Sequence, residues 1–363
     1  IFEDDEVNNH VVKEASVDLI LNDNIDTCLL FTAGPMGCSD TVDIEIVGEN
    51  ETFESKKQIN LPRFGTELIS ISNTFKNIPN NFSGILKASQ PKQPLFYGRL
   101  LGGQWNSSGE FSANHTYYDF QNVEDYWKDN QPSKSYYPFF SELINSIRIY
   151  PLSSPSELEI FVTPVLEDST ILDEIFIDNL ISPSNKFIDK NLNSLFSNLK
   201  IDLDKLSSYI VTAKVKNGKK PGRISLQVVY GKGSLESSIN MTLYNPGTFV
   251  GNKKSFKWGQ TVTSSKFETL VGITTAPIDD PTKKIYECHV QFYDETGKIA
   301  DRNWEIKSGT SKKFTISEEL NLTINQNSVP HYVWCVIEGD PGISFNAVTY
   351  NNKTNNCSGD HGF

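Results

Sequence analysis

An internal repeat constrains this chain of 363 residues more than any other feature of its sequence. Three stretches, which begin at Thr41, Gly222 and Tyr286, each open with a run in which apolar and polar residues alternate. Such alternation is typical of a strand that buries one face. A turn follows (GENE, GKGS or DETG), and a second, more polar strand then leads to a Gly-Thr pair. Each stretch therefore predicts a β-hairpin.

The spacing within the repeat is constant. The second apolar residue of the opening strand stands equally far from the closing glycine in all three stretches, which pair Ile46 with Gly65, Val228 with Gly247 and Val290 with Gly309. An apolar strand containing Thr-Ala precedes each hairpin. Consecutive short strands joined by turns are typical of antiparallel sheets stacked in a sandwich. The sequence thus predicts a mainly β protein of tandem antiparallel β-sandwich domains, Ig-like or jelly-roll-like, with one or two helices in the central region.

The first and third copies of the repeat continue in parallel beyond the hairpin. Both give an aromatic-rich strand, a connection that contains glycine, and a final strand with a histidine. That histidine is His115 in SANHTYYDF and His361 in SGDHGF. We interpret the two stretches as the last strand of two related domains, and the histidines as strand-end residues rather than catalytic or metal-binding ones. The middle copy shows no such tail.

These observations predict three domains. Residues 1–120 form a β-sandwich that ends in the histidine strand, residues 121–262 form a central β-rich domain with a helical insertion, and residues 263–363 form a sandwich related to the first. The central region contains the strand-like runs SIRIYPL, ELEIFVTPV and LDEIFIDNLI. Its apolar residues from Phe187 to Leu199 are spaced roughly as in a helix.

The central region is also the densest in aromatic residues, with nine between Tyr117 and Phe140. Its order of an aromatic-rich entry, paired strands and the strand IFIDNLI resembles jelly-roll carbohydrate-binding modules, over less than a quarter of the chain. The resemblance implies that aromatic side chains stack on sugar faces. Burial in a core or in a seam between domains is the favoured interpretation of the same residues. The candidate glycan-binding residues are Tyr126, Trp127, Tyr136 and Tyr137.

Charge and hydropathy exclude two classes of partner. The net charge is −12, which disfavours nucleic acid because phosphates require a surface rich in Lys and Arg. No apolar run approaches the roughly 18 residues needed to cross a bilayer, so no membrane span is expected. Self-association, other surface proteins and glycans remain as the expected partners.

Cysteines and glycosylation motifs bear on the location of the protein. The five cysteines include no CxxC pair, which disfavours a zinc or redox site. A Cys28–Cys38 disulfide with a second bridge among the last three cysteines, and buried free thiols, are equally compatible with the sequence. Eight Asn-x-Ser/Thr motifs exceed the chance expectation and predict a secreted or cell-surface glycoprotein. The glycosylation candidates are Asn50, Asn81, Asn106, Asn114, Asn240, Asn321 and Asn352, and Asn356 completes the set.

Motifs of catalysis are missing from the sequence. It contains no GxSxG, no GxxxxGK[ST] and no HExxH. A run at Asp189 begins like a calcium loop but lacks its glycine and its bidentate glutamate, so calcium stays an option that no motif supports, and no other cofactor is expected. Acidic residues that could form a glycosidase pair, such as Glu157 and Glu174, alternate along strands and are better explained as a solvated face.

The sequence therefore favours a non-enzymatic extracellular or cell-surface protein with a structural or adhesive role, built from repeated β-sandwich units. A glycan-binding protein that uses the aromatic stretch at 117–140 is the alternative. A hydrolase without known motifs is the third option, since active sites need not follow known motifs.

Overall fold

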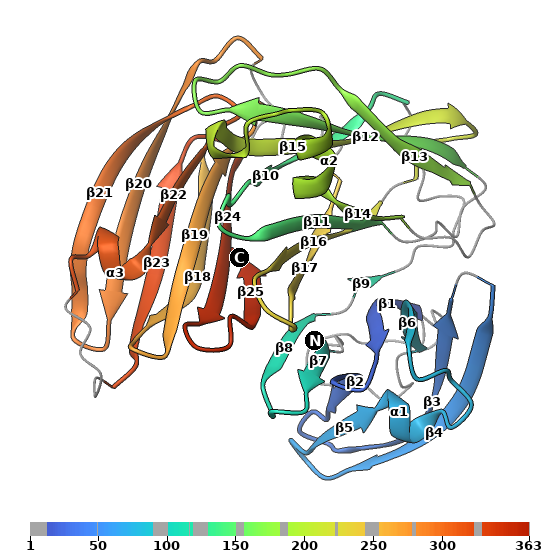
Figure 1. Cartoon of the computed structure of the whole chain (residues 1–363). Helices are drawn as coiled ribbons and strands as arrows, with labels where there is room; N and C mark the ends of the chain where they lie inside the picture. Colours follow the sequence, from blue (N-terminus) through green and yellow to red (C-terminus); the bar gives the residue numbers. More distant parts are fainter. Residues whose placement is uncertain are drawn as a thin grey trace. The chain divides into compact units, whose positions relative to one another are not determined.

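The computed structural model describes residues 13–48, 50–89, 101–115, 117–118, 130–149, 156–181, 188–221, 224–243, 254–277, 281–322 and 329–362. Antiparallel strands and a few short helices make up the regular structure, and the predicted mainly β class is confirmed (Figure 1). The chain divides into two compact units. One holds residues 1–125, 150–154 and 182–187, and the other holds residues 126–149, 155–181 and 188–363.

The first unit contains one β-sandwich. Its strands pair into one sheet with the order β4-β3-β6-β1-β9 and a second with the order β5-β2-β7-β8. Inward side chains of both sheets, among them Leu19, Phe31 and Ile46, are fully buried in a common core. The elements are β1 (Lys13–Leu21), β2 (Ile25–Thr32), β3 (Cys38–Val47), β4 (Thr52–Leu61), β5 (Thr66–Ser70), α1 (Ile71–Thr74), β6 (Phe82–Ser89), β7 (Leu101–Asn106), β8 (Phe111–His115) and β9 (Tyr117–Tyr118).

The second unit begins with the middle sandwich. Its sheets have the orders β10-β15-β12-β13 and β14-β11-β16-β17. The elements are β10 (Ser133–Pro138), β11 (Ile144–Ile149), β12 (Glu157–Leu166), β13 (Ile175–Ile181), β14 (Ile188–Asn191), α2 (Leu192–Asn198), the 3₁₀ helix η3 (Leu203–Lys205), β15 (Leu206–Asn217), β16 (Ser225–Gly231) and β17 (Ser237–Thr242). The predicted strands SIRIYPL and ELEIFVTPV are β11 and β12, and these lie in different sheets rather than paired with each other.

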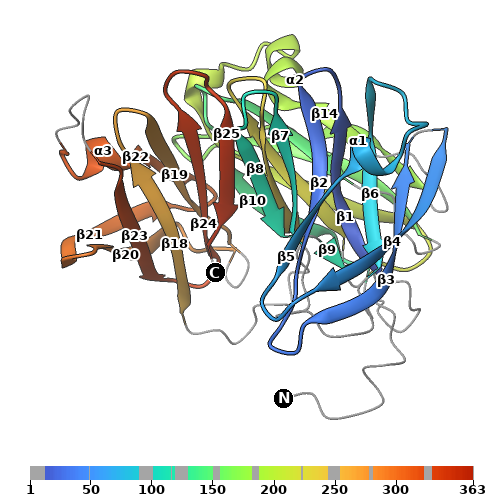
Figure 2. The same ribbon diagram turned by 90° about the horizontal axis from the view of Figure 1, so that it is seen from below.

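The third sandwich completes the second unit. Its sheets have the orders β18-β23-β20-β21 and β22-β19-β24-β25, and Figure 2 shows the second set side by side. The first strand, β18, starts at Ser255, ahead of the expected domain boundary between 262 and 263. The elements are β18 (Ser255–Thr263), β19 (Phe267–Thr275), β20 (Ile285–Asp294), β21 (Gly297–Lys307), β22 (Ser311–Thr315), α3 (Ile316–Glu319), β23 (His331–Gly339), β24 (Ile343–Asn351) and β25 (Cys357–His361).

All three sandwiches share one topology. Counted within each sandwich, the first sheet has the strand order 4-3-6-1 and the second has the order 5-2-7-8, with β9 as an addition at the edge of the first unit. A short helix follows the fifth strand in every case. The helix expected as an insertion in the central domain, α2, therefore occupies the same place as α1 and α3.

Register supports the same equivalence. In each sandwich, the last residue of the fifth strand occupies the N-cap position of the following helix. These residues are Ser70, Asn191 and Thr315. Its partners on the second strand are Cys28, Ser146 and Leu270. His115 and His361 also correspond, because they pair with Leu101 and Asn346 at matching positions of the seventh strand. His115 and His361 thus end equivalent strands, β8 and β25, of two sandwiches with the same topology.

The predicted alignment of the middle copy was wrong. Residues 206–242 form the sixth, seventh and eighth strands of the middle sandwich, whereas the stretches matched to them are the second, third and fourth strands of the outer sandwiches. A buried strand followed by a polar hairpin occurs at both places in this topology, so the same alternation arises twice. The middle copy is complete, and its first half, β10 to β14, lies in the central region upstream of the matched stretch.

A buried side chain at the start of the second strand fixes a corner in every sandwich. The Thr27 hydroxyl accepts from Ile20 N at 3.0 Å and donates to Ile20 O at 2.9 Å. Thr269 makes the same two bonds with Val262, at 2.9 and 2.8 Å. In the middle sandwich Asn145 replaces threonine and binds both backbone groups of Phe140, at 3.0 and 2.8 Å. Each corner thereby satisfies two backbone groups where the chain turns from the first strand into the second.

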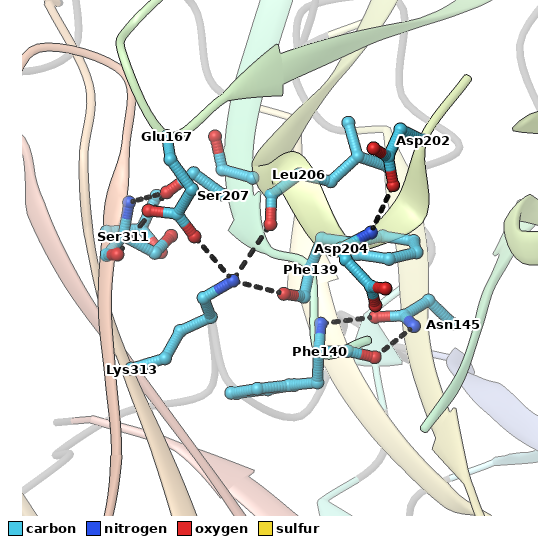
Figure 3. A network of polar contacts seen from close by, with 12 residues as sticks. Phe139, Phe140, Asn145, Glu167, Asp202, Asp204, Leu206, Ser207, Ser311 and Lys313 are labelled. Atoms are coloured by element: carbon cyan, nitrogen blue, oxygen red, sulfur yellow. Dashed lines mark hydrogen bonds and ion pairs between the residues drawn. The ribbon is translucent and has the colours of Figure 1, made fainter. Parts of the chain in front are cut away.

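Polar groups join the middle and third sandwiches within the second unit (Figure 3). The Lys313 ammonium on β22 donates to the carbonyl oxygens of Leu206 and Phe139, at 2.8 and 3.1 Å. It also pairs with Glu167 at 2.9 Å. The Ser207 hydroxyl accepts from Ser311 N at 2.9 Å, so the two strands β15 and β22 are linked directly. We call the contacts of these six residues the junction.

Close backbone approach accompanies the junction. A Cβ atom placed on Gly272 of β19 would lie 2.6 Å from the Pro138 side chain, so only glycine fits there. A further hydrogen bond joins the same two sandwiches: Leu235 N, between β16 and β17, donates to the Asn356 side chain, between β24 and β25, at 2.9 Å. Ser207, Ser311 and Asn356 are all buried and all have hydrogen-bond partners, as buried polar groups require.

Candidate functional site

The third sandwich exposes four large aromatic side chains on one sheet face. Phe256 and Trp258 stand on β18, and Tyr332 and Trp334 on β23, the neighbouring strand. Their exposed fractions are 61%, 38%, 54% and 40%. The indole rings of Trp258 and Trp334 lie 5.4 Å apart, tilted by 44°. We call these four residues the aromatic face.

Strand periodicity places these rings outward. Alternate residues of β23, namely Val333, Cys335 and Ile337, are fully buried in the core of the third sandwich, so Tyr332 and Trp334 point to the opposite side. Gly259 of β18 pairs with Cys335, which leaves Trp258 on the outer side as well. Both sides of β23 are therefore apolar, although only one side contributes to the core.

A hollow of about 660 Å³ adjoins the Phe256 end of the aromatic face. Register connects the two features, because Phe256 pairs with Glu338, Glu338 with His289, and His289 with Asn303. The side chains that reach the hollow combine carboxylates with a cation, an imidazole and an amide. Its lining includes Lys254, Glu287, His289, Asn303, Glu305, Glu338 and Asp340.

Ion pairs organise the carboxylates around the hollow. The Lys254 ammonium donates to Glu338 and holds the pKa of that carboxyl below its usual value, while the same bond raises the pKa of Lys254. Asp340 pairs with Lys283 at 2.8 Å and accepts from Glu287 N at 2.7 Å. The site can thus offer fixed, charged hydrogen-bond acceptors beside aromatic rings.

A second hollow, of about 440 Å³, lies in the first unit. It is bordered by Asp26, Lys76 and Trp105 together with asparagines of the β1–β2 turn. The Asp26 carboxylate already accepts from Ser70 Oγ at 2.6 Å and from Ser72 Oγ at 2.9 Å. Asp26 therefore holds the start of α1, and Glu268 does the same for Ser317 in the third sandwich at 3.4 Å. The acid at this position has a structural role in both sandwiches.

The glycan-binding residues expected from the sequence do not form a surface in the described residues. Tyr137 is 1% exposed, its hydroxyl donates to the Thr242 carbonyl at 3.3 Å, and its ring lies 5.7 Å from that of Tyr209. Tyr137 is thus a core residue with no ring face for a sugar. Tyr136 is half-buried, and burial raises its pKa to about 12. Tyr126 and Trp127 lie outside the described residues.

The glycosylation candidates differ in exposure. Asn50, Asn81, Asn321 and Asn352 are exposed, and Asn106 is half-buried. Asn240 is 2% exposed and accepts from Gln227 Nε2 at 2.6 Å, while Asn114 is 9% exposed. Folding before modification would therefore leave Asn240 and Asn114 without glycans.

All five cysteines are buried free thiols, which selects that alternative over disulfides. Among the described residues, no group of three or more His, Cys, Asp or Glu side chains is arranged to hold a metal ion. Glu157 and Glu174 pair with Lys216 and Lys214 respectively, as surface carboxylates do. No helix in the described part of the chain is long and apolar enough to span a membrane.

Comparisons with known proteins add no family. No protein-family model matches the chain, and no curated protein matches it. The site is thus defined by its own geometry. Sequence reasoning missed the aromatic face, although HYVWCVIEG and SFKWGQTVT carry a readable signal: aromatic residues alternate with the core positions of a strand, so both faces of the strand are apolar.

Proposed function

We propose that this chain is a non-enzymatic extracellular or cell-surface protein with a structural or adhesive role. The observation that supports this most is the junction, in which hydrogen bonds of Lys313 and of the buried Ser207 and Ser311 join two sandwiches of one topology. A contact of this kind resists bending between neighbouring sandwiches, which suits a stalk, a fibre or a surface layer. Exposed glycosylation motifs such as Asn81 and Asn321 are in keeping with that location.

Self-association has a candidate surface in the middle sandwich. The strand β13 is the edge of its sheet, and Phe176 and Ile181 on it are 50% and 52% exposed. An apolar edge strand can pair with another chain. The edge strands β4 and β21 carry many charges instead, among them Lys56 and Asp301, and charged edges discourage such pairing.

Electron microscopy combined with light scattering tests the structural role. We expect the purified chain to form oligomers or filaments in neutral buffer. A Phe176→Lys/Ile181→Lys double variant should remain monomeric, because charge on an edge strand opposes pairing. The control variant, Asp301→Lys on the β21 edge, should assemble like the wild type. A wild type that stays monomeric at every concentration would exclude self-assembly as the main role.

Glycan binding is the second candidate function. The stretch 117–140 gives it little support, since Tyr137 belongs to the core. The aromatic face and its hollow favour it instead, because rings beside fixed polar groups are what sugar recognition requires. The two functions are compatible, since an adhesive protein needs a ligand.

A further inference from the structure

We propose that the aromatic face of the third sandwich binds a neutral polysaccharide, with pyranose rings stacked along the four aromatic side chains and one end of the chain in the adjoining hollow. This inference rests on the adhesive role proposed above and names a ligand class for it. It does not require self-assembly, which uses a different sandwich.

The four rings form a diagonal row across two neighbouring strands. In the ladder of paired residues, Phe256 lies beside Glu338, Trp258 beside Val336, Trp334 beside Gln260, and Tyr332 beside Val262. Successive rings are two residues apart along the strand direction, so the four rings together span roughly 20 Å. A strip of this length suits an extended chain of several sugar rings better than a single small molecule.

Exposure of these rings to water is unfavourable, and a bound partner that covers them would be stabilised by the burial of their apolar surface. Scattered exposed apolar residues are ordinary on proteins, whereas a contiguous patch marks a binding surface. Trp258 and Trp334 contact each other and are still more than one third exposed, so their pairing does not remove them from solvent.

The chemistry of the strip and the hollow together selects a sugar. A pyranose ring has polarised C–H groups on its faces and hydroxyl groups around its rim, and the negative face of an aromatic ring attracts such C–H groups. The rim hydroxyls need hydrogen-bond partners at the side of the strip. Glu338, His289 and Asn303 provide them in one row that continues from Phe256. A purely apolar partner would bury His289 and Asn303 without offering them hydrogen bonds, which is unfavourable.

The charge of the hollow selects a neutral polymer. Four carboxylates border it, from Glu287, Glu305, Glu338 and Asp340, and the ammonium groups of Lys254 and Lys283 pair with two of them, so the lining keeps a net negative charge. A uronate or sulfate group would meet this negative lining, and like charges repel. Carboxylates instead form strong hydrogen bonds with neutral hydroxyl donors.

Affinity electrophoresis in native gels tests the proposal. Gels contain hydroxyethyl cellulose, galactomannan, a soluble β-1,3-glucan or alginate, the last as an anionic polymer. We expect at least one neutral polymer to retard the wild type and alginate to have no effect. The Trp258→Ala/Trp334→Ala variant should lose affinity at least tenfold, and Glu338→Gln several-fold. Phe176→Ala removes an equally exposed ring from the middle sandwich and should bind like the wild type.

Three results would overturn the proposal. The first is a wild type that no neutral polymer retards, and the second is a Trp258→Ala/Trp334→Ala variant with unchanged retardation and an unchanged unfolding curve. The third is a wild-type dimer in light scattering that this variant abolishes while no polysaccharide binds, which would assign the aromatic face to a second copy of the chain. The assembly-blocking variant Phe176→Lys/Ile181→Lys should keep its affinity, so failure of assembly is distinguished from failure of binding.

Discussion

The sixth strand of the middle sandwich and that of the third occupy the same place in one topology but use their outer sides differently. On β15 the outer residues include Ser208 and Thr212, which are small and buried, and Ser208 donates to the carbonyl of Gly309 in the third sandwich. On β23 the outer residues Tyr332 and Trp334 are large and exposed. Small hydroxyl side chains permit another backbone to approach, whereas rings hold it away. Side-chain size at one scaffold position therefore separates a surface that joins two sandwiches from one that leaves aromatic rings exposed.

The largest expected loss of stability concerns the corner that supports the junction. Asn145→Ala leaves the buried Phe140 N without its acceptor, and it removes one of two donors to each of the carbonyl oxygens of Phe140 and Leu143. One unsatisfied buried group costs about 1–3 kcal/mol and each lost hydrogen bond about 1 kcal/mol, so we expect a loss of about 3 kcal/mol in the free energy of unfolding. Urea titration followed by circular dichroism measures it. Asn303→Ala on the surface of the third sandwich is the control and should change the free energy by about 0.5 kcal/mol or less.

Lys313→Met should break the junction itself. The methionine keeps most of the apolar stem of lysine but leaves the carbonyls of Phe139 and Leu206 without this donor. We expect a loss of about 2 kcal/mol, and a separation of the unfolding transitions of the middle and third sandwiches. Lys205→Met is the matched control, since Lys205 forms an exposed pair with Asp202 that should contribute less than about 0.5 kcal/mol. Equal effects of the two substitutions would mean that the junction does not hold the sandwiches together.

A polar substitution on the inner side of β23 should lower the stability of the third sandwich. Cys335 is fully buried between core side chains, and Cys335→Ser places a hydroxyl in that apolar site at a cost of about 1–2 kcal/mol. Thermal unfolding at pH 7 measures the loss. Ser344→Cys, at a half-buried position of β24, serves as the reverse exchange at a site outside the core and should have little effect.

Alkaline pH should destabilise the folded chain through the same thiol. Burial raises the pKa of Cys335 from 9.0 to about 12. Between these values the unfolded chain releases the proton and the folded chain keeps it, so the free energy of unfolding falls as pH rises from about 9 to 12. Below pH 9 both states hold the proton, and this group causes no pH dependence. Burial also raises the pKa values of Cys28, Cys288 and Cys357 to about 12, so Cys335→Ala should reduce the slope in that window without abolishing it. An unchanged slope would assign the alkaline loss to other groups.

The sequence predicted those features of the fold that depend on local pattern. Hairpins at GENE and DETG, and the equivalence of His115 with His361, follow from alternation and turn residues, which are properties of neighbouring positions. The alignment of the middle copy failed because β15 and β16 alternate as β2 and β3 do. Only non-local pairing distinguishes a sixth strand from a second, and no local pattern encodes it.

The candidate site was missed for a related reason. Residues 117–140 concentrate aromatic residues along the sequence, whereas the aromatic face is assembled from two strands more than seventy positions apart. A high density of aromatic residues along the sequence does not mean that these residues lie on the surface. Tyr137, from the dense stretch, is buried in the core, whereas Trp334 is 40% exposed. The side of a strand that meets the core is set by the whole sandwich, so the count of aromatic residues in a window cannot predict which of them bind.

The smallest expected effect on stability belongs to the aromatic face, and measuring it separates the role of the exposed rings from that of the junction. Phe256→Ser alters a ring that is 61% exposed, so the free energy of unfolding should change by about 0.5 kcal/mol or less. Affinity for a neutral polysaccharide should nevertheless fall several-fold, because Phe256 connects the strip to the hollow. Parallel urea titrations and affinity gels of Phe256→Ser and Lys313→Met measure both quantities. If the junction variant loses stability but not affinity, and the face variant loses affinity but not stability, then joining and binding belong to separate surfaces of the third sandwich. If both variants lose stability alone, the exposed rings serve the fold, and the division between joining and binding surfaces fails.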